Sequence, residues 1–163
     1  MATKRRNYNG VQINQSVTIV EKAGANIEDV RNRIMTFDDN GCVVLATAGT
    51  DIPVGIALIE AGYNDITGVT SGMAAAGDDI DIQIKDIGVA IAGSTIKKGQ
   101  EVAAGADGFA VAAAGGDYVL GISLSDAEEG NYFRVQIAKY QKSGGGSTST
   151  DSTEEGTDQT ETV

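Results

Sequence analysis

A period-two alternation of apolar and polar residues is the feature that most constrains how this chain folds. Successive side chains of a β-strand point to opposite faces, so such alternation indicates strands with one buried and one solvent-facing side. The clearest alternating segments are residues 11–20, 79–85, 87–91 and 133–138. Turn sequences built on glycine lie between them, as expected where short strands follow one another.

Helical spacing is confined to one short segment. Ile27, Val30 and Ile34 recur at i, i+3 and i+7, the periodicity of about two helical turns. Many short strands with few aromatic side chains favour a small barrel or sandwich. We therefore predict an all-β fold, a small barrel or sandwich, with at most one short helix near residues 27–34.

An internal repeat divides the alternating region. Residues 40–58 read NGCVVLATAGTDIPVGIAL, and residues 107–124 read DGFAVAAAGGDYVLGISL. Both begin with Asx-Gly, continue through a small-apolar strand to Ala-Gly and an Asp, and end on Gly-Ile-small-Leu. The sequence therefore predicts two related β units that pack into one core, rather than a solenoid, which needs three or more repeats.

The repeat continues beyond these segments. Glu60-Ala61 matches Asp126-Ala127, and the alternating residues 81–84 match residues 134–137. The related units then cover about residues 40–84 and 107–137. The first unit contains roughly a dozen additional residues, 63–76, and such an insertion is a place where a function specific to one unit can be added.

The last 21 residues, 143–163, differ in composition from the rest of the chain. They are rich in Ser, Thr and Gly, include five acidic residues, and contain Val163 as their only large apolar side chain. Such a segment buries too little surface to offset the entropy of ordering. We predict a β domain over residues 11–142, followed by a disordered acidic tail over residues 143–163.

The first ten residues form a candidate basic arm. A short basic segment with one aromatic side chain suits docking on an acidic neighbour or on a second copy of the chain. We therefore take it as the candidate surface for contact with a partner protein or a neighbouring subunit. Its candidate contact residues are Lys4, Arg5, Arg6, Asn7 and Tyr8.

Composition excludes most of the usual catalytic chemistry. The chain has no His, which removes the commonest general base and zinc ligand, and its single Cys42 rules out an internal disulfide. Cys42 lies in an apolar run, where we expect it to be buried. The net charge of −11, with 23 acidic and 12 basic residues, argues against a nucleic-acid-binding surface. No stretch approaches the length of a membrane span.

Acidic clusters are the remaining candidates for chemistry. Residues 34–84 contain eight acidic and no basic residues, which indicates a solvated acidic face or a surface matched to a basic partner. Asp38-Asp39 is typical of a turn, and Asp79 and Asp81 are expected on the solvent face of a strand. Neither cluster has the spacing of a calcium-binding loop. We predict no catalytic, cofactor-binding or metal-binding residues, and no enzymatic activity.

One lysine-containing turn resembles another class of β fold. Residues 97–102, Lys-Lys-Gly-Gln-Glu-Val, are similar to a turn of biotinyl and lipoyl carrier domains, which are also quasi-duplicated. Such domains present the modified lysine at a hairpin tip. The nearest candidate for that lysine is Lys85, at the end of an alternating strand before Asp86.

The C-terminal half resembles the head decoration proteins of tailed phages, also called capsid cement proteins. The matching features are a Gly-polar-x-Val turn at residues 99–102, a Val-Leu-Gly-Ile strand at 119–122, an acid-Ala pair at 126–127 and a closing strand at 133–137. The match covers about residues 55–140 and is best after Ile96. The additional residues 63–76 and the acidic tail depart from the shortest members of the family.

The resemblance implies a structural virion protein that binds the outer surface of an expanded phage capsid. It would stabilise the shell by bridging capsid subunits. Its partners would be the major capsid protein and other copies of itself, with which it would form a homotrimer. It would use no cofactor and bind neither nucleic acid nor membrane. Before assembly it would be located in the host cytoplasm. The arm, residues 1–10, is the segment expected to become ordered on the shell.

Two alternatives share the same composition. One is a small β module of another phage structure, such as a fibre or a baseplate, which would have a different partner. The other is a biotinyl- or lipoyl-like carrier domain, which predicts a covalent mass increase on a lysine.

Overall fold

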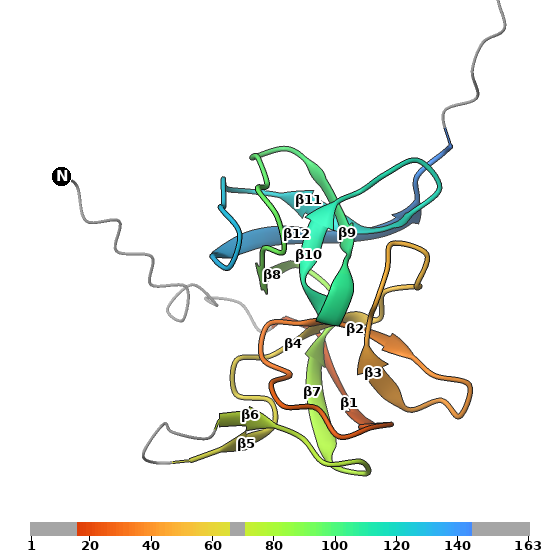
Figure 1. Cartoon of the computed structure of the whole chain (residues 1–163), viewed down its shortest axis with the longest axis vertical. Helices are drawn as coiled ribbons and strands as arrows, with labels where there is room; N and C mark the ends of the chain where they lie inside the picture. Colours follow the sequence, from red (N-terminus) through yellow and green to blue (C-terminus); the bar gives the residue numbers. More distant parts are fainter. Residues whose placement is uncertain (1–15, 66–70, 145–163) are drawn as a thin grey trace, which may run out of the picture.

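Antiparallel strands account for nearly all of the regular structure (Figure 1). The computed structural model describes residues 16–65 and 71–144. Within this part of the chain there are twelve strands and one short 3₁₀ helix, Ala106–Gly108. The all-β prediction is therefore confirmed. No helix in the described residues is long and apolar enough to span a membrane.

The N-terminal half forms a five-stranded sheet with the order β1-β7-β4-β2-β3. All pairings between neighbouring strands are antiparallel. The strands are β1 (Thr18–Lys22), β7 (Asp79–Gln83), β4 (Gly55–Ala57), β2 (Ile34–Phe37) and β3 (Val43–Leu45).

The C-terminal half forms a second five-stranded sheet with the order β8-β12-β11-β9-β10. This sheet is also antiparallel throughout. Its strands are β8 (Ile87–Ile91), β12 (Tyr132–Gln141), β11 (Tyr118–Ser123), β9 (Glu101–Ala104) and β10 (Ala110–Ala112).

The two sheets have the same topology. Read along the chain, β1, β2, β3, β4 and β7 occupy the same places in the first sheet as β8, β9, β10, β11 and β12 in the second. We call residues 18–83 the N-terminal unit and residues 87–141 the C-terminal unit; they occupy the lower and upper parts of Figure 1. The relationship between the units therefore begins two strands earlier than the sequence repeat indicates.

Matched hydrogen bonds fix the alignment of the units. The amide of Ile27 donates to the carbonyl of Ala74 at 2.8 Å, as the amide of Ile96 donates to that of Ala127 at 2.8 Å. Ala127 therefore corresponds to Ala74, and the expected match with Ala61 is wrong. The additional residues of the N-terminal unit lie between Leu58 and Ala74, where β5 (Tyr63–Asn64) pairs with β6 (Ser71–Met73).

The segment around residues 27–34 is not helical. The amide of Val30 donates to the carbonyl of Gly72 at 2.8 Å, and Ile27 forms an antiparallel bridge with Ala74. Asn32 has a left-handed backbone with φ of 58°, and β2 begins two residues later. Two isolated helical turns are unstable by themselves, so pairing with residues 72–74 decides the conformation.

Each sheet curls without closing into a barrel. The edge strands of the N-terminal unit approach each other at a single parallel bridge, Ala23 with Val43. The C-terminal unit repeats that contact between Ala92 and Ala110. Each curled sheet therefore has a concave inner face and a convex outer face.

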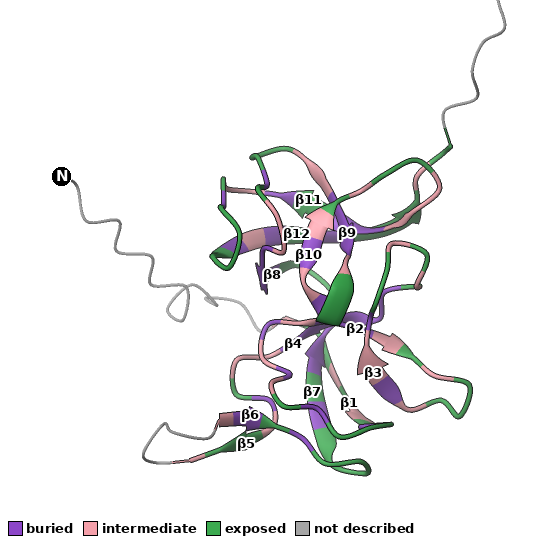
Figure 2. Cartoon of the chain, viewed as in Figure 1, coloured by how far each residue is buried: buried purple, intermediate pink, exposed green. Residues whose placement is uncertain are grey.

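Two apolar clusters form the core (Figure 2). One fills the concave face of the N-terminal unit and includes Met35, Ile80 and Ile82. The other fills the concave face of the C-terminal unit, around Leu120 and Phe133. This second cluster also takes in Ile34, Ala46 and Ile56 from the N-terminal unit, so the units share part of their core.

The predicted terminal segments lie outside the described residues. The arm, residues 1–10, and residues 145–163 of the acidic tail are not described, so their predicted roles stay predictions. Cys42 is half-buried rather than buried, and it is a free cysteine. It stands beside β3, where Val43 rather than Cys42 enters the core.

Candidate binding surface

Polar contacts hold the two units in one orientation. The Arg33 guanidinium lies 3.6 Å from the centre of the Phe109 ring and donates to the carbonyl of Asp107 at 3.0 Å. Burial lowers the pKa of Arg33, and the nearby carboxylates of Asp29 and Asp107 partly offset this shift. The buried side chain of Asn32 donates to the carbonyl of Val89 at 2.9 Å. Stacking of a partly desolvated guanidinium on a ring stabilises the junction by about 1 kcal/mol.

The junction buries three of the four side chains in a row that runs across the convex face of the N-terminal sheet, and the fourth, Thr18, is exposed. Direct cross-strand pairs define this row, which we call the N-terminal outer row. Its members are Ile34, Ile56, Gln83 and Thr18. Ile34 is 0%, Ile56 2% and Gln83 3% exposed. Gln83 is satisfied there by donating to the carbonyls of Lys85 and Ile87 at 2.8 and 3.0 Å.

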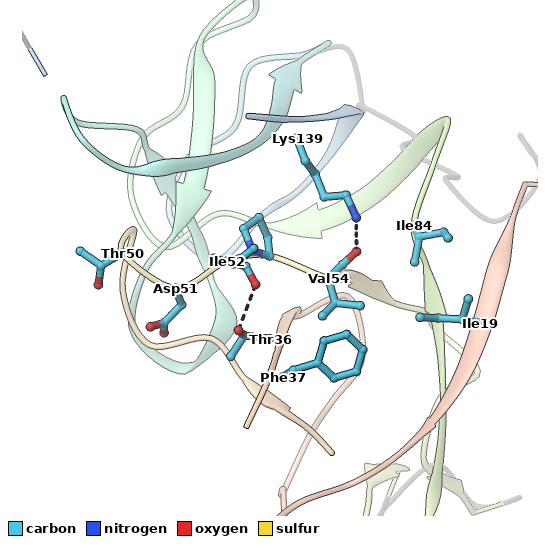
Figure 3. Close-up of a pocket in the computed structure, with 10 residues that line it drawn as sticks. Ile19, Thr36, Phe37, Thr50, Asp51, Ile52, Val54, Ile84 and Lys139 are labelled. Atoms are coloured by element: carbon cyan, nitrogen blue, oxygen red, sulfur yellow. Dashed lines mark hydrogen bonds between the residues drawn. The ribbon is translucent and has the colours of Figure 1, made fainter. Parts of the chain in front are cut away.

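An open groove lies at the end of the concave face of the N-terminal unit (Figure 3). It has a volume of about 630 Å³ and a mainly apolar lining. Ile19 and Ile84 form one side and Phe37 and Val54 the floor, as Figure 3 shows. The remaining lining residues are Thr36, Thr50, Asp51, Ile52, Pro53 and Lys139.

Two polar contacts shape the groove. Lys139, from the C-terminal unit, donates its ammonium to the carbonyl of Val54 at 2.8 Å. Partial burial lowers the pKa of this ammonium. The hydroxyl of Thr36 donates to the carbonyl of Ile52 at 2.9 Å, which ties the 50–54 loop to β2 (Figure 3). The groove therefore presents the Lys139 cation and the Asp51 carboxylate within a mainly apolar lining.

Asp51 closes the turn that precedes the groove. It accepts hydrogen bonds from the amide of Thr47 at 2.7 Å, the hydroxyl of Thr47 at 2.9 Å and the amide of Ala48 at 3.2 Å. The amide of Thr47 is the main reason that the pKa of Asp51 is lowered, against the opposing effect of burial. Its carboxylate is thus a structural acceptor within the loop.

The groove has the chemistry of a binding surface. General acid–base or nucleophilic catalysis needs two reactive groups within hydrogen-bonding distance. Here the Asp51 carboxylate is bonded to its own loop, and the Lys139 ammonium is bonded to a backbone carbonyl. No group of three potential metal ligands occurs in residues 16–65 and 71–144.

The acidic clusters serve the fold. Asp38 accepts from the amides of Asn40 at 2.8 Å and Cys42 at 2.9 Å, as predicted for a turn between strands. Asp79 and Asp81 are exposed on the outer side of β7, also as predicted. Asp79 forms an ion pair with Lys22 at 2.8 Å. Together with Asp51 in its turn, these contacts show that several acids of residues 34–84 serve local structure.

The remaining candidates from the sequence are the arm residues and Lys85. Lys4, Arg5, Arg6, Asn7 and Tyr8 lie outside the described residues. Lys85 is exposed in the connection between β7 and β8, which belong to different sheets, so it does not stand at a hairpin tip. Sequence inspection missed the groove, although exposed Ile52 beside Pro53 and Phe37 at a strand end are the signals that indicate it.

The fold resembles that of a phage structural protein. No family model matches the sequence, and no curated protein matches it. A solved structure with a similar fold is the N base of the head fibre gp8.5 of bacteriophage phi29, with a TM-score of 0.54 and 24% sequence identity. The alignment covers 76% of this chain and 95% of that chain. At this identity, the likeness shows a shared fold.

Proposed function

We propose that this chain is a structural virion protein of a tailed phage that binds the outer surface of the expanded capsid. The observation that supports the proposal most directly is the fold shared with the N base of a phage head fibre. The resemblance of residues 55–140 to head decoration proteins is independent support, because it rests on sequence motifs. A role without catalysis agrees with the lack of His in the sequence.

The proposed mechanism is stabilisation by mass action. A protein that binds the expanded shell but not the unexpanded shell stabilises the expanded form. Contacts with two neighbouring copies of the major capsid protein make each bound chain a bridge, and many identical weak contacts add together. The arm, residues 1–10, is the proposed capsid contact, with Lys4, Arg5 and Arg6 matched to an acidic capsid surface. On the shell the protein would be a homotrimer.

A fibre module is the second candidate. The structural neighbour is the base of a head fibre rather than a decoration protein, which favours this alternative. Stoichiometry separates the two functions. We expect a decoration protein to bind in fixed proportion to the capsid subunits, and a fibre base to bind in fewer copies at particular positions on each head.

The test is co-sedimentation of the purified protein with expanded phage heads that lack it. We expect saturable binding at a fixed ratio to the capsid subunit. Saturation at a much smaller number of copies per head would assign the fibre function instead. Absence of binding to any head would overturn both proposals.

Charge-matched variants test the arm. Replacement of Lys4, Arg5 and Arg6 by Ser is expected to reduce capsid affinity by at least about tenfold, because each lost ion pair with the shell weakens docking. The control replaces Lys85, Lys97 and Lys98 by Ser, which removes the same charge from exposed positions outside the arm. Equal loss in both variants would contradict a specific role of the arm.

A further inference from the structure

The two units meet head to tail within the chain. The convex face of the N-terminal sheet packs against the concave face of the C-terminal unit, and Ile34 and Ile56 enter the core there. A Cβ placed on Gly88 would lie 2.8 Å from Cδ1 of Ile56 and 3.3 Å from Cδ1 of Ile137. Ile56 thus lies over Gly88 and Ile137 at the end of that concave face.

Each half of this junction has a counterpart on the other unit. Cross-strand pairs place Glu101, Ile122, Gln136 and Ile87 in a row across the C-terminal sheet. This C-terminal outer row corresponds, strand by strand, to the N-terminal outer row of Ile34, Ile56, Gln83 and Thr18. The C-terminal row is on the surface, with Ile122 37% and Ile87 46% exposed.

The groove is the counterpart of the covered concave end. Ile19 and Ile84, which line the groove, hold the positions that Gly88 and Ile137 hold in the C-terminal unit. The amide of Ile84 donates to the carbonyl of Val17 at 3.1 Å, as that of Ile137 donates to Asp86 at 2.8 Å. The end of the concave face is therefore open in the N-terminal unit, whereas the same surface is covered in the C-terminal unit.

We propose that a second copy of this chain docks its C-terminal outer row into the groove of the N-terminal unit. The intermolecular contact would repeat the junction that already joins the two units, so the existing interface continues into the next copy. Such a contact is heterologous, because different surfaces of the two copies meet. It generates a ring where the rotation closes, and a filament where it does not.

Continuity with the internal junction supports a second copy as the occupant. The C-terminal row corresponds to a row that is already docked within the chain, and the groove corresponds to the surface that receives it. Glu101 stands in the C-terminal row where Ile34 stands in the N-terminal row. Its carboxylate is paired with Lys142 and accepts a hydrogen bond from Tyr140, so it carries its own counter-ion into the contact.

The groove is shallower than the corresponding surface of the C-terminal unit, because two of its residues are larger than their counterparts. Ile19 corresponds to Gly88, and Phe37 corresponds to Ala104. The Ile19 side chain fills part of the space that corresponds to that of Ile56, because a Cβ on Gly88 would lie 2.8 Å from Cδ1 of Ile56. Phe37 adds a larger side chain to the lining of the groove. We therefore expect association that is weak, depends on concentration and strengthens wherever copies are held close together.

The test uses complementary lysine variants of the full chain, studied by sedimentation equilibrium in solution. Ile122→Lys damages the row, and Phe37→Lys damages the groove. Each variant alone is expected to associate at least about tenfold more weakly than the wild type, because docking would bury a charge. The control is Val20→Lys, which is exposed on the convex side of β1 and outside both surfaces.

The mixture is the decisive measurement. Each variant keeps one intact half of the contact, so equal amounts of Ile122→Lys and Phe37→Lys are expected to form a species of two chains and nothing larger. Failure of the mixture to associate where the wild type does would overturn the head-to-tail arrangement. A wild type that stays monomeric up to about 1 mM would overturn it too. Ile122→Gln and Phe37→Gln repeat the test if a lysine variant unfolds.

The proposal does not depend on capsid binding, because the measurement contains no capsid. A second experiment tests residues 1–15 of the same chain as an alternative occupant, because the described residues begin at Ser16, shortly before Ile19. Deletion of residues 1–15 would then strengthen association by opening the groove. Stronger association after the deletion would overturn the proposal that the full-length chain associates through this groove. Unchanged association would support the proposal.

Discussion

The two units have the same strand order but opposite surfaces. The C-terminal unit closes off Ile34, Ile56 and Gln83 of the N-terminal outer row from solvent, whereas the C-terminal outer row faces outward. Conversely, the concave end is covered in the C-terminal unit and open as a groove in the N-terminal unit. A head-to-tail junction between two copies of one fold leaves one unused surface at each end.

Side-chain identity follows this difference in exposure. Ile34 in the covered row has Glu101 as its counterpart in the exposed row, where the carboxylate contacts Lys142 and Tyr140. In contrast, Gln83 and Gln136 are the same residue in buried and exposed positions. The buried copy is tolerated because both its amide hydrogens are bonded to backbone carbonyls. The residue that a position in either row needs therefore depends on whether the neighbouring unit covers it, and not on the strand order that the two units share.

Alanine at the two corresponding isoleucines would test the comparison most strongly. Ile56→Ala is expected to lower the free energy of unfolding by about 3 kcal/mol, because it leaves a cavity in the shared core. Ile122→Ala is expected to lower it by about 1 kcal/mol or less, since its side chain is already 37% exposed and leaves no enclosed cavity. Urea denaturation of both variants measures the difference. Equal losses would show that the C-terminal row is buried in solution.

Glycine substitutions would show where the units are alike. A Cβ on Gly55 would collide with the backbone carbonyl of Gln83, and a Cβ on Gly121 with that of Gln136. Gly55→Ala and Gly121→Ala are each expected to lower the free energy of unfolding by about 2 kcal/mol, because a backbone strand must move. Thermal unfolding checks this, with Gly144→Ala as the control where a Cβ meets nothing within 4 Å. A harmless change at either glycine would contradict the shared register.

Much of the fold could be predicted because its signals are local. Alternation located β7, β8 and β12, and matched turns around Asp51 and Asp117 revealed the repeat. Residues 81–84 and 134–137 were aligned correctly, since the Gln of each pairs with the isoleucine that follows the strand glycine. The match of Ala61 with Ala127 failed because similar short motifs flank the insertion.

The candidate surface could not be predicted in the same way. The groove combines β1, β2, the 50–54 loop and residues after β7 with Lys139, which is distant in the sequence. The local sequence patterns do not indicate whether the N-terminal or the C-terminal outer row is covered, because that depends on how the two units pack together. Within the two rows, Glu101 in place of Ile34 reflects which row is exposed, and this difference becomes informative once the strands are aligned.

The smallest expected effect compares the turn acids of the two units. Asp51 accepts three hydrogen bonds from Thr47 and Ala48, whereas its counterpart Asp117 accepts one from the amide of Ala114 at 2.7 Å. At pH 7, Asp51→Asn should lower the free energy of unfolding by about 1 kcal/mol and Asp117→Asn by about half as much. The pKa of Asp51 is lowered in the folded state, chiefly by the amide of Thr47, so its ionised form stabilises the fold above the unfolded pKa of about 3.9. That contribution is lost as the pH falls through the lowered pKa, because both states then bind the proton. Urea titrations at pH 7, 5 and 3 should therefore show the Asp51→Asn difference shrinking toward acid, and a difference that stays constant to pH 3 would contradict a structural role for the carboxylate charge.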